Sequence, residues 1–199
     1  ENNSFRSEVE AGEYCLHHKG DQWLKNQAIN TNILQYWKEY QPQAKMICMG
    51  TSCSYAPAIP MQEDNYLLGQ PEPSLYTYAM TKRMLLLGLQ AIEHQYGLKW
   101  LYFIPSTLYG PGFELDDNHF IFDFIRNCYN AKYGGDEFIV WGDGEQRREL
   151  IYVDDAVDAM ITTRVLEHLG ENDFLKTSLE EGLKTSIEYF KEKYRGENK

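Results

Sequence analysis

A tyrosine and a lysine four residues apart, Tyr78 and Lys82, are the side chains in this sequence best suited to chemistry. On a helix, positions i and i+4 share one face, so the ammonium group would lie beside the phenol. A free tyrosine with a pKa near 10 is a poor base at neutral pH, and a nearby cation lowers that pKa. The spacing therefore predicts a proton donor with its cation, able to exchange a proton with an alcohol.

The Tyr-x-x-x-Lys spacing alone is weak, because the chain has 15 tyrosines and holds a second instance, Tyr189 with Lys193. No buried strand or hydroxyl-bearing loop precedes that second pair, so we predict a solvent-exposed i,i+4 pair there. The first pair differs, because a buried apolar run leads into MGTSCSY, which carries Thr51 and Cys53. Open parallel sheets bind ligands at such strand ends, so these two side chains join the predicted site.

The elements that must position these residues alternate between strands and helices. Apolar residues at helical spacing predict helices at residues 23–40, 74–96 and 118–131, with two more beginning near residues 154 and 179. Short apolar runs bounded by polar turns predict buried strands at residues 44–50, 98–105, 137–142 and 149–153. This alternation predicts an α/β fold built of βαβ units, with a parallel sheet and helices on both faces.

Capping residues mark the predicted helix ends. The N-terminal candidates are Ser74 or Thr77, Asp154 or Asp155, and a capping box of Ser178 with Glu181, while Gly97 marks a C-terminus. We expect the helix at residues 74–96 to bury the following side chains: Met80, Met84, Leu85, Leu87, Leu89, Ala91 and Ile92. Four prolines block regular structure in the connection at residues 51–74, and connections of this length are usually functional or disordered.

Composition limits the classes of partner. The 199 residues have a net charge of −11, which argues against a nucleic-acid groove and against binding an anionic membrane surface. No long apolar run predicts a membrane span, and the polar first residues predict no signal peptide, so we expect a cytoplasmic protein. The cysteines lack metal-ligand spacing, which predicts no metal site and reduced thiols. We expect Cys15, Cys48 and Cys128 in the core and treat Cys53 separately.

Four segments in order, MGTSCSYAP, YTYAMTK, PSTLYGPG and VWGDGEQRRELIYVDDAVDAM, resemble the extended short-chain dehydrogenase/reductase family, the NAD-dependent epimerase/dehydratases of nucleotide sugars. The resemblance runs from about residue 21 to 160 and is strongest to members that act on GDP-linked 4-keto-6-deoxy sugars. It implies a Rossmann-like, doubly wound parallel sheet with a small C-terminal substrate domain. It also implies NADP(H) or NAD(H) as cofactor and a homodimer formed by the helices at residues 76–96 and 118–131.

The resemblance assigns roles to the residues of the first site. It implies that Tyr78 is the acid/base and that Lys82 binds the nicotinamide ribose while tuning Tyr78. Thr51 stands where the family has a catalytic serine or threonine, although it can be read as a strand-end hydroxyl only. Pro105 and Ser106 stand on the turn expected beside the nicotinamide.

Cys53 and His119 stand where the resembled branch has an epimerising thiol and imidazole. Such a pair can move protons at a carbon beside a ketone, where the C–H bond is acidified. The alternatives are an inert core thiol for Cys53, and helix capping or packing for His119.

Three further residues are implied to contact substrate: Thr107, Arg126 and Arg148. Arg148 matches the family's arginine on the nucleotide diphosphate, a task that suits a planar, always-charged fork. Arg126 and the neighbouring Arg147 are weaker candidates, for which a solvated charge is an equal reading. Thr107 replaces an asparagine usual in the family, so a contact is altered there.

Parts of the family pattern are absent from the sequence. No strand with a G-x-x-G-x-x-G turn precedes residue 21, and the two helices after residue 154 nearly touch. We expect residues 1–111 and 150–166 to be the remainder of a dinucleotide-binding domain, and 112–149 and 167–199 that of a substrate domain. Either the sequence omits stretches of a longer protein, which we favour, or the gene product is truncated.

These observations give two hypotheses of function. The first is a nucleotide-sugar epimerase and/or reductase acting on a GDP-4-keto-6-deoxy sugar. The alternative is a non-catalytic or truncated family member that binds a sugar nucleotide or a protein partner.

Overall fold

The structure is a computed structural model that describes residues 17–113, 119–135, 137–139, 143–165 and 176–197. The chain divides into two compact units, one ending at Pro105 and the other beginning at Ser106. We describe each unit by itself. The predicted assignment of segments to a cofactor domain and a substrate domain stays a prediction.

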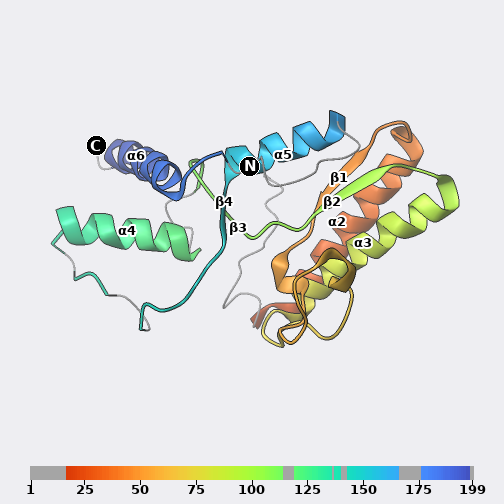
Figure 1. Ribbon diagram of the computed structural model, residues 1–199, viewed down its shortest axis with the longest axis horizontal. Coiled ribbons are helices and arrows are strands. Elements are labelled where there is room, and N and C mark those ends of the chain that lie inside the picture. Colours follow the sequence, from red (N-terminus) through yellow and green to blue (C-terminus); the bar gives the residue numbers. More distant parts are fainter. Residues whose placement is uncertain (1–16, 114–118, 136, 140–142, 166–175, 198–199) are drawn as a thin grey trace. The chain divides into compact units, whose positions relative to one another are not determined.

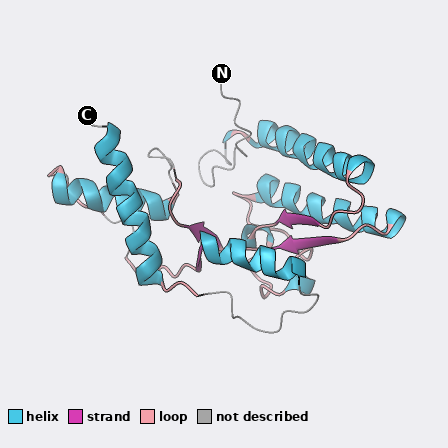
Figure 2. Cartoon of the chain, turned by 90° about the horizontal axis from the view of Figure 1, so that it is seen from above, coloured by secondary structure: helices cyan, strands magenta, loops and turns pink. Residues whose placement is uncertain are grey.

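The first unit is a helix followed by a βαβ unit. Its elements are α2 (Lys19–Tyr40), β1 (Met46–Met49), the 3-10 turns η1 (Ser52–Ser54) and η2 (Glu63–Asn65), α3 (Tyr76–Tyr96) and β2 (Trp100–Phe103). Strands β1 and β2 pair in parallel, from Met46 opposite Trp100 to Met49 opposite Phe103. Figure 1 shows α2 beside α3, and Figure 2 shows the two strands running the same way. The predicted parallel pairing is confirmed.

Apolar side chains from both helices and both strands form the core of this unit. Trp37 and Leu89 are almost completely buried, and the Trp37 indole donates a 2.8 Å hydrogen bond to the Ala44 carbonyl. On α3, Leu85 and Leu89 face the core, as expected from their spacing of four. The prediction for Met84, Leu87 and Ala91 was wrong, because these three share a neighbouring face that is exposed. The predicted and observed buried residues therefore agree at Leu85 and Leu89, on the side of α3 that faces the core.

The ends of α3 show one wrong and one confirmed prediction. Leu75 occupies the N-cap, and neither Ser74 nor Thr77 caps the helix; the Ser74 hydroxyl donates instead to Glu72 Oε1, 3.2 Å away. At the other end Gly97 adopts φ 70°, and its N–H binds the Glu93 carbonyl. A glycine tolerates this left-handed conformation without a Cβ clash, so the helix stops there.

The second unit also contains a parallel strand pair. Its elements are β3 (Thr107–Tyr109), α4 (Phe120–Tyr133), β4 (Leu150–Tyr152), α5 (Val153–Val165) and α6 (Leu179–Glu197). Thr107 lies opposite Leu150 in the parallel β3–β4 ladder. No strand was predicted at β3, because the glycines and the proline after it hid a three-residue strand. Residues 137–139, predicted as part of a strand, are not in one, and residues 140–142 lie outside the described residues.

An aromatic core holds the second unit together. Phe113 stacks on Phe190 with ring centroids 6.0 Å apart, and Tyr109 meets Tyr152 edge to face at 5.6 Å. Such ring pairs contribute beyond the area that they bury. Side chains from β3, β4, α4 and α6 thus share one cluster.

The predicted helix caps in the second unit have different outcomes. The capping box is confirmed, because Glu181 N–H donates to Ser178 Oγ and Ser178 N–H donates to Glu181 Oε2. Helix α5 begins at Val153, so Asp154 and Asp155 lie inside its first turn. The Asp155 carboxylate accepts hydrogen bonds from the N–H and the hydroxyl of Thr177.

The cysteines differ from expectation at one position. Cys48 is buried as predicted, Cys128 is exposed on α4, and Cys15 lies outside the described residues. All three described cysteines are free thiols. Among the described helices, none is both long and apolar enough to cross a bilayer.

Candidate active site

Lys82 reaches from the second turn of α3 back to the end of strand β1. Its ammonium nitrogen donates a 3.2 Å hydrogen bond to the Met49 carbonyl and lies 6.0 Å from the centre of the Tyr78 ring. The Tyr78 side chain is buried, with 8% of its surface exposed. The helix therefore places the cation beside the phenol ring, as the i,i+4 spacing predicts.

Thr51 is separated from β1 by Gly50 and is the N-cap residue of the turn η1. Its hydroxyl accepts a 3.3 Å hydrogen bond from the Cys53 N–H, and its carbonyl accepts one from Ser54 N–H. A threonine at this N-cap position satisfies a donor that the short turn leaves open. The Thr51 hydroxyl proton is not needed for this contact, so it remains available to a ligand oxygen.

Two contacts hold the Thr51–Cys53 segment against α3. The buried Ser54 hydroxyl donates to the Ala79 carbonyl at 3.2 Å, next to Tyr78 in the sequence. Together with the bond from Lys82 to Met49, this fixes the segment at both ends on the first two turns of the helix. The structure thus joins the segment that carries Thr51 and Cys53 to the helical turns that carry Tyr78 and Lys82.

Arg83 is a buried cation that the sequence reasoning missed. Its guanidinium donates five hydrogen bonds to main-chain carbonyls of the connection, at Ser54 (two bonds), Leu67, Leu68 and Gly69. Only 4% of the residue is exposed. A long connection with many unpaired carbonyls next to a helical arginine is the signal that would have found it.

Two tyrosine hydroxyls, also missed, link the strand end to α3. Thr51 N–H donates to Tyr66 Oη at 3.3 Å, the Tyr66 and Tyr102 hydroxyls are 3.1 Å apart, and Tyr102 donates to the Lys82 carbonyl at 2.8 Å. Tyr66 comes from the loop after η2 and Tyr102 from strand β2. Nothing in their spacing along the sequence predicts that they meet.

Gly50 makes room for these rings. A Cβ atom built on Gly50 would lie 2.5 Å from Tyr102 Cε1 and 2.9 Å from Tyr66 Oη. Real Cβ atoms essentially never make contacts this short, so any side chain here would displace a tyrosine. The glycine of MGTSCSY is therefore required by a close approach to the hydroxyl pair.

Burial shapes the electrostatics of the junction. Burial lowers the pKa of Lys82 below its ordinary 10.5, and interaction with Cys48 opposes that shift. Burial raises the pKa of the Cys48 thiol to about 11, while the positive charge of Lys82 acts in the other direction. A lysine of lowered pKa is costly to keep charged without a partner, which favours an added acceptor nearby.

The second Tyr-x-x-x-Lys pair is not solvent-exposed, so that prediction was wrong. Tyr189 and Lys193 are half-buried on α6, with Lys193 Nζ 5.6 Å from the ring centre. Lys193 donates a 3.0 Å hydrogen bond to the Phe113 carbonyl. Both pairs thus have similar geometry, and only the surrounding segments distinguish them.

His119 belongs to the second unit, at the N-cap of α4. Its side chain makes no capping hydrogen bond, and its ring meets Phe122 edge to face with centroids 6.5 Å apart. His119 thus occupies the N-cap position without capping through its side chain, and packing against Phe122 describes one of its contacts.

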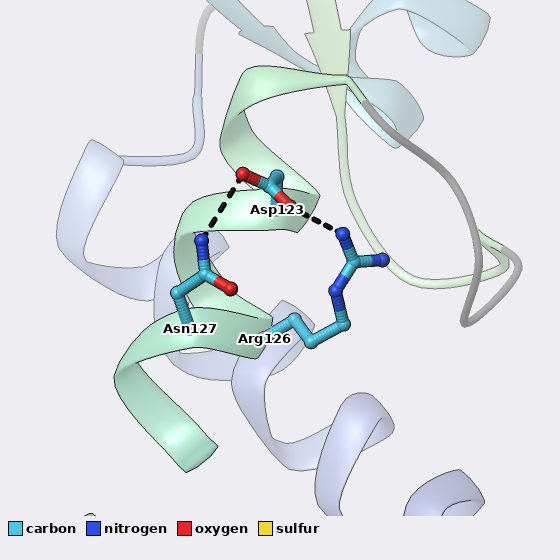
Figure 3. A network of polar contacts seen from close by, with 3 residues as sticks. All are labelled: Asp123, Arg126 and Asn127. Atoms are coloured by element: carbon cyan, nitrogen blue, oxygen red, sulfur yellow. Dashed lines mark hydrogen bonds and ion pairs between the residues drawn. The ribbon is translucent and has the colours of Figure 1, made fainter. Parts of the chain in front are cut away.

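The two candidate arginines of the second unit both have partners within that unit. Arg126 pairs with Asp123, whose other oxygen accepts a 3.1 Å hydrogen bond from Asn127 (Figure 3). Arg148 is exposed, donates to Gln146 Oε1 at 3.3 Å and lies 6.0 Å from the Phe120 ring centre. The Arg126 guanidinium is partly occupied by Asp123, whereas Arg148 makes one long hydrogen bond to Gln146 and lies over the ring of Phe120.

The predicted nicotinamide-side turn crosses from one unit to the next. Pro105 is the last residue of the first unit, and Ser106 and Thr107 open the second. Thr107 N–H pairs with the Glu149 carbonyl at 3.3 Å. The Ser106 Oγ is buried and has no hydrogen-bond partner among the described residues. An unused buried hydroxyl fits a turn that contacts a ligand.

In the described part of the chain, no three His, Cys, Asp or Glu side chains cluster as metal ligands. The candidate residues of the first unit are a phenol, an ammonium, hydroxyls and a thiol, and the second unit carries the imidazole of His119. These groups suit proton transfer to and from alcohols and acidified carbons.

Comparisons with known proteins identify sequence relatives of the chain. The chain is 34% identical over 142 residues to a probable GDP-L-fucose synthase 1 from Oryza sativa, and 30% over 149 residues to a GDP-L-fucose synthase from Escherichia coli. These matches cover 68% and 72% of this chain but only 43% and 46% of the relatives. The chain therefore spans less than half the length of these curated relatives.

Solved structures share the Rossmann-like fold. A GDP-L-fucose synthetase from Naegleria fowleri bound to NADP superposes with a TM-score of 0.74 at 22% identity, covering 93% of this chain and 74% of that one. A GDP-mannoheptose C4 reductase from Campylobacter jejuni with NADP bound gives 0.76 at 16% identity, covering 92% and 79%. The family model described as "NAD dependent epimerase/dehydratase family" matches residues 8–173. The chain belongs to the NAD dependent epimerase/dehydratase family.

Proposed function

We propose that this protein is an NADP(H)-dependent epimerase/reductase of a GDP-4-keto-6-deoxy sugar. The observation that supports the proposal is a pair of hydrogen bonds, from Ser54 to the Ala79 carbonyl and from Lys82 to the Met49 carbonyl. They join the segment that carries Thr51 and Cys53 to the first two turns of α3, which carry Tyr78 and Lys82. The names of the relatives, GDP-L-fucose synthases and a GDP-L-colitose synthase, support the substrate class.

The residues present fit a nicotinamide cofactor. Lys82 has three donors, of which the Met49 carbonyl takes one, so two remain for ribose hydroxyls. Ser106 offers an unused buried hydroxyl at the turn expected beside the nicotinamide. Bound there, the cofactor would supply hydride to the carbon of the sugar ketone.

In the reduction, Tyr78 delivers the proton to the ketone oxygen as that oxygen becomes a hydroxyl. Thr51 donates a hydrogen bond to the same oxygen and so stabilises its developing negative charge. Lys82, whose cation lies beside the ring of Tyr78, favours the phenolate that remains after the transfer. The Cys53 N–H donates a hydrogen bond to the Thr51 hydroxyl and so orients it toward the ketone oxygen.

In the epimerisation, Cys53 and His119 exchange protons at carbons next to the ketone. The thiol of Cys53 is free and partly exposed, as a group that meets substrate must be. One residue removes the proton as a base and the other returns a proton to the opposite face, which inverts the centre. Arg148 would bind the diphosphate, and Arg126 and Thr107 are weaker substrate contacts.

Isotope exchange tests the two halves separately. The complete protein is incubated with the GDP-4-keto-6-deoxy sugar in deuterated water without NADPH, and deuterium uptake beside the ketone is followed by mass spectrometry. Cys53→Ser should abolish uptake while NADPH affinity stays unchanged, and unaltered uptake would remove Cys53 from its role. Tyr78→Phe should abolish NADPH oxidation and leave uptake in place.

Cofactor titration separates this proposal from a non-catalytic family member. A complete protein that binds a GDP-sugar but gives no NADPH binding and no exchange would support the binding protein. We further propose a homodimer, with exposed apolar side chains on α3 and α4 such as Leu87 and Phe124 available for contact, and a cytoplasmic location. Sedimentation analysis of the complete protein tests the oligomeric state.

A further inference from the structure

We propose that Tyr66 and Tyr102 are positioning residues, whose hydroxyls join the backbone of Thr51 to the backbone of Lys82. This inference rests on the proposed function, because it gives the two tyrosines the task of keeping two reacting groups in register. Neither tyrosine needs to touch substrate or cofactor for this role.

The directions of these three hydrogen bonds follow from the two groups at the ends of the series, the Thr51 N–H and the Lys82 carbonyl. The Thr51 N–H can only donate, so Tyr66 Oη is the acceptor at that end. The Lys82 carbonyl can only accept, so the single Tyr102 proton is committed to it. Tyr102 Oη must then accept from Tyr66, across 3.1 Å. One arrangement satisfies all three contacts, and hydrogen bonds in such a series strengthen one another.

Packing prevents the two rings from adopting another arrangement. Tyr66 is 1% exposed, and the rings meet edge to face with centroids 5.6 Å apart. The Gly50 backbone lies against both tyrosines, leaving no space for a side chain. Burial raises the pKa of Tyr102, with Tyr66 adding to the shift, so its donor proton stays in place at neutral pH.

The series of hydrogen bonds through the tyrosines and the hydrogen bond of the Lys82 side chain both connect the end of β1 to Lys82. Lys82 Nζ binds the carbonyl of Met49, and its main-chain carbonyl is connected through the tyrosines to Thr51, two residues further along. The strand end is therefore connected to α3 through both the side chain and the main-chain carbonyl of Lys82. Loss of a hydroxyl would let the Thr51 turn and the Lys82 turn move independently, which matters when geometry controls rate.

The test uses Tyr66→Phe and Tyr102→Phe in the complete protein, with Tyr55→Phe as the matched control. Tyr55 packs edge to face on Tyr66 at 5.3 Å, yet its hydroxyl makes no hydrogen bond within the described residues. Each test variant should lower kcat for ketone reduction about tenfold, the effect of about one hydrogen bond, with NADPH Kd within about twofold of wild type. The control should change neither value.

Two spectroscopic readouts do not depend on activity. In Tyr66→Phe, hydrogen exchange at the Thr51 amide should accelerate about tenfold, because that donor loses its acceptor. The ¹³Cε resonance of Lys82 should move in both test variants and stay fixed in Tyr55→Phe.

The outcomes separate this inference from the proposed function. A wild-type protein that is inactive toward the GDP-sugar, with a Lys82 resonance that still responds to Tyr66→Phe, would overturn the function and support the connection. A Lys82 resonance that ignores Tyr66→Phe would overturn the connection, whatever the activity. Changed resonances with an unchanged kcat in an active enzyme would reduce both tyrosines to packing residues and overturn the positioning role.

Discussion

The ammonium group of Lys82 is bound to the carbonyl of Met49, 3.2 Å away, at the last residue of strand β1. Lys193 makes the equivalent bond on α6, to the Phe113 carbonyl at 3.0 Å, beside its own tyrosine. The local geometry of a tyrosine and a lysine one turn apart is thus not distinctive. What distinguishes Lys82 is that its carbonyl partner leads directly into the Thr51 turn.

We expect Lys82→Met to weaken NADPH binding and to lower turnover about 100-fold or more, because it removes the cation beside Tyr78 while keeping the stem. Lys193→Met is the matched control and should leave both quantities within about twofold of wild type. Titration of NADPH fluorescence and steady-state kinetics on the complete protein provide the measurements. Equal losses in the two variants would contradict the assignment of Lys82.

Thr51→Val should lower kcat about 100-fold, because the donor to the developing oxyanion is lost. It should also cost about 1 kcal/mol of unfolding free energy, because the Cys53 N–H loses its cap. Thr51→Ser keeps the hydroxyl and should restore most of both. If Thr51→Val lost stability alone, with kcat intact, Thr51 would be a strand-end cap only.

Arg83→Met should lower the unfolding free energy by at least about 2 kcal/mol, because several buried carbonyls lose a charged donor. Arg83→Lys keeps the charge but not the planar fork, so it should recover only part of that loss. Urea denaturation gives the free energies, and limited proteolysis reports on the connection between η1 and α3. Resistance to cleavage equal to wild type in Arg83→Met would argue against this anchoring role.

Cys48 should give the stability an alkaline dependence. Burial raises the pKa of the Cys48 thiol from the ordinary 9.0 to about 11, so the unfolded chain releases this proton first as pH rises. Its contribution is therefore complete below pH 9 and is lost toward pH 11, by on the order of 2 kcal/mol. Unfolding free energies of wild type and Cys48→Ala, measured from pH 8 to 10.5, should converge with rising pH. Parallel curves would contradict a buried neutral thiol.

The parts of the fold that repeat a local pattern were predictable from sequence. The strand before MGTSCSY, the helix ending at Gly97 and the capping box at Ser178 each depend on residues close together in the chain. Strand β3 was missed because three residues carry too little periodicity, and Gly110 and Pro111 follow it at once. The exposed face of α3 was mistaken for core because leucines occupy both faces.

The candidate site was predictable only in its reacting groups. Tyr78, Lys82, Thr51 and Cys53 were found because their types and spacing imply chemistry. Arg83, Tyr66 and Tyr102 were not, because their contacts join segments 14 to 36 residues apart and involve main-chain atoms of any sequence. The supporting structure of a site depends on tertiary contacts, which composition and periodicity do not encode.

The absent side chain of Gly50 has an evolutionary consequence. Since the Tyr102 ring occupies the volume of a would-be methyl group, the two positions cannot diverge in arbitrary order. Alanine fits at position 50 only after the Tyr102 ring and the Tyr66 hydroxyl have moved away or been lost, which breaks the hydrogen bonds between the two hydroxyls first. The order in which substitutions occur at this strand end therefore matters. A library that randomises positions 50 and 102 together should yield folded variants that neither single-site library contains.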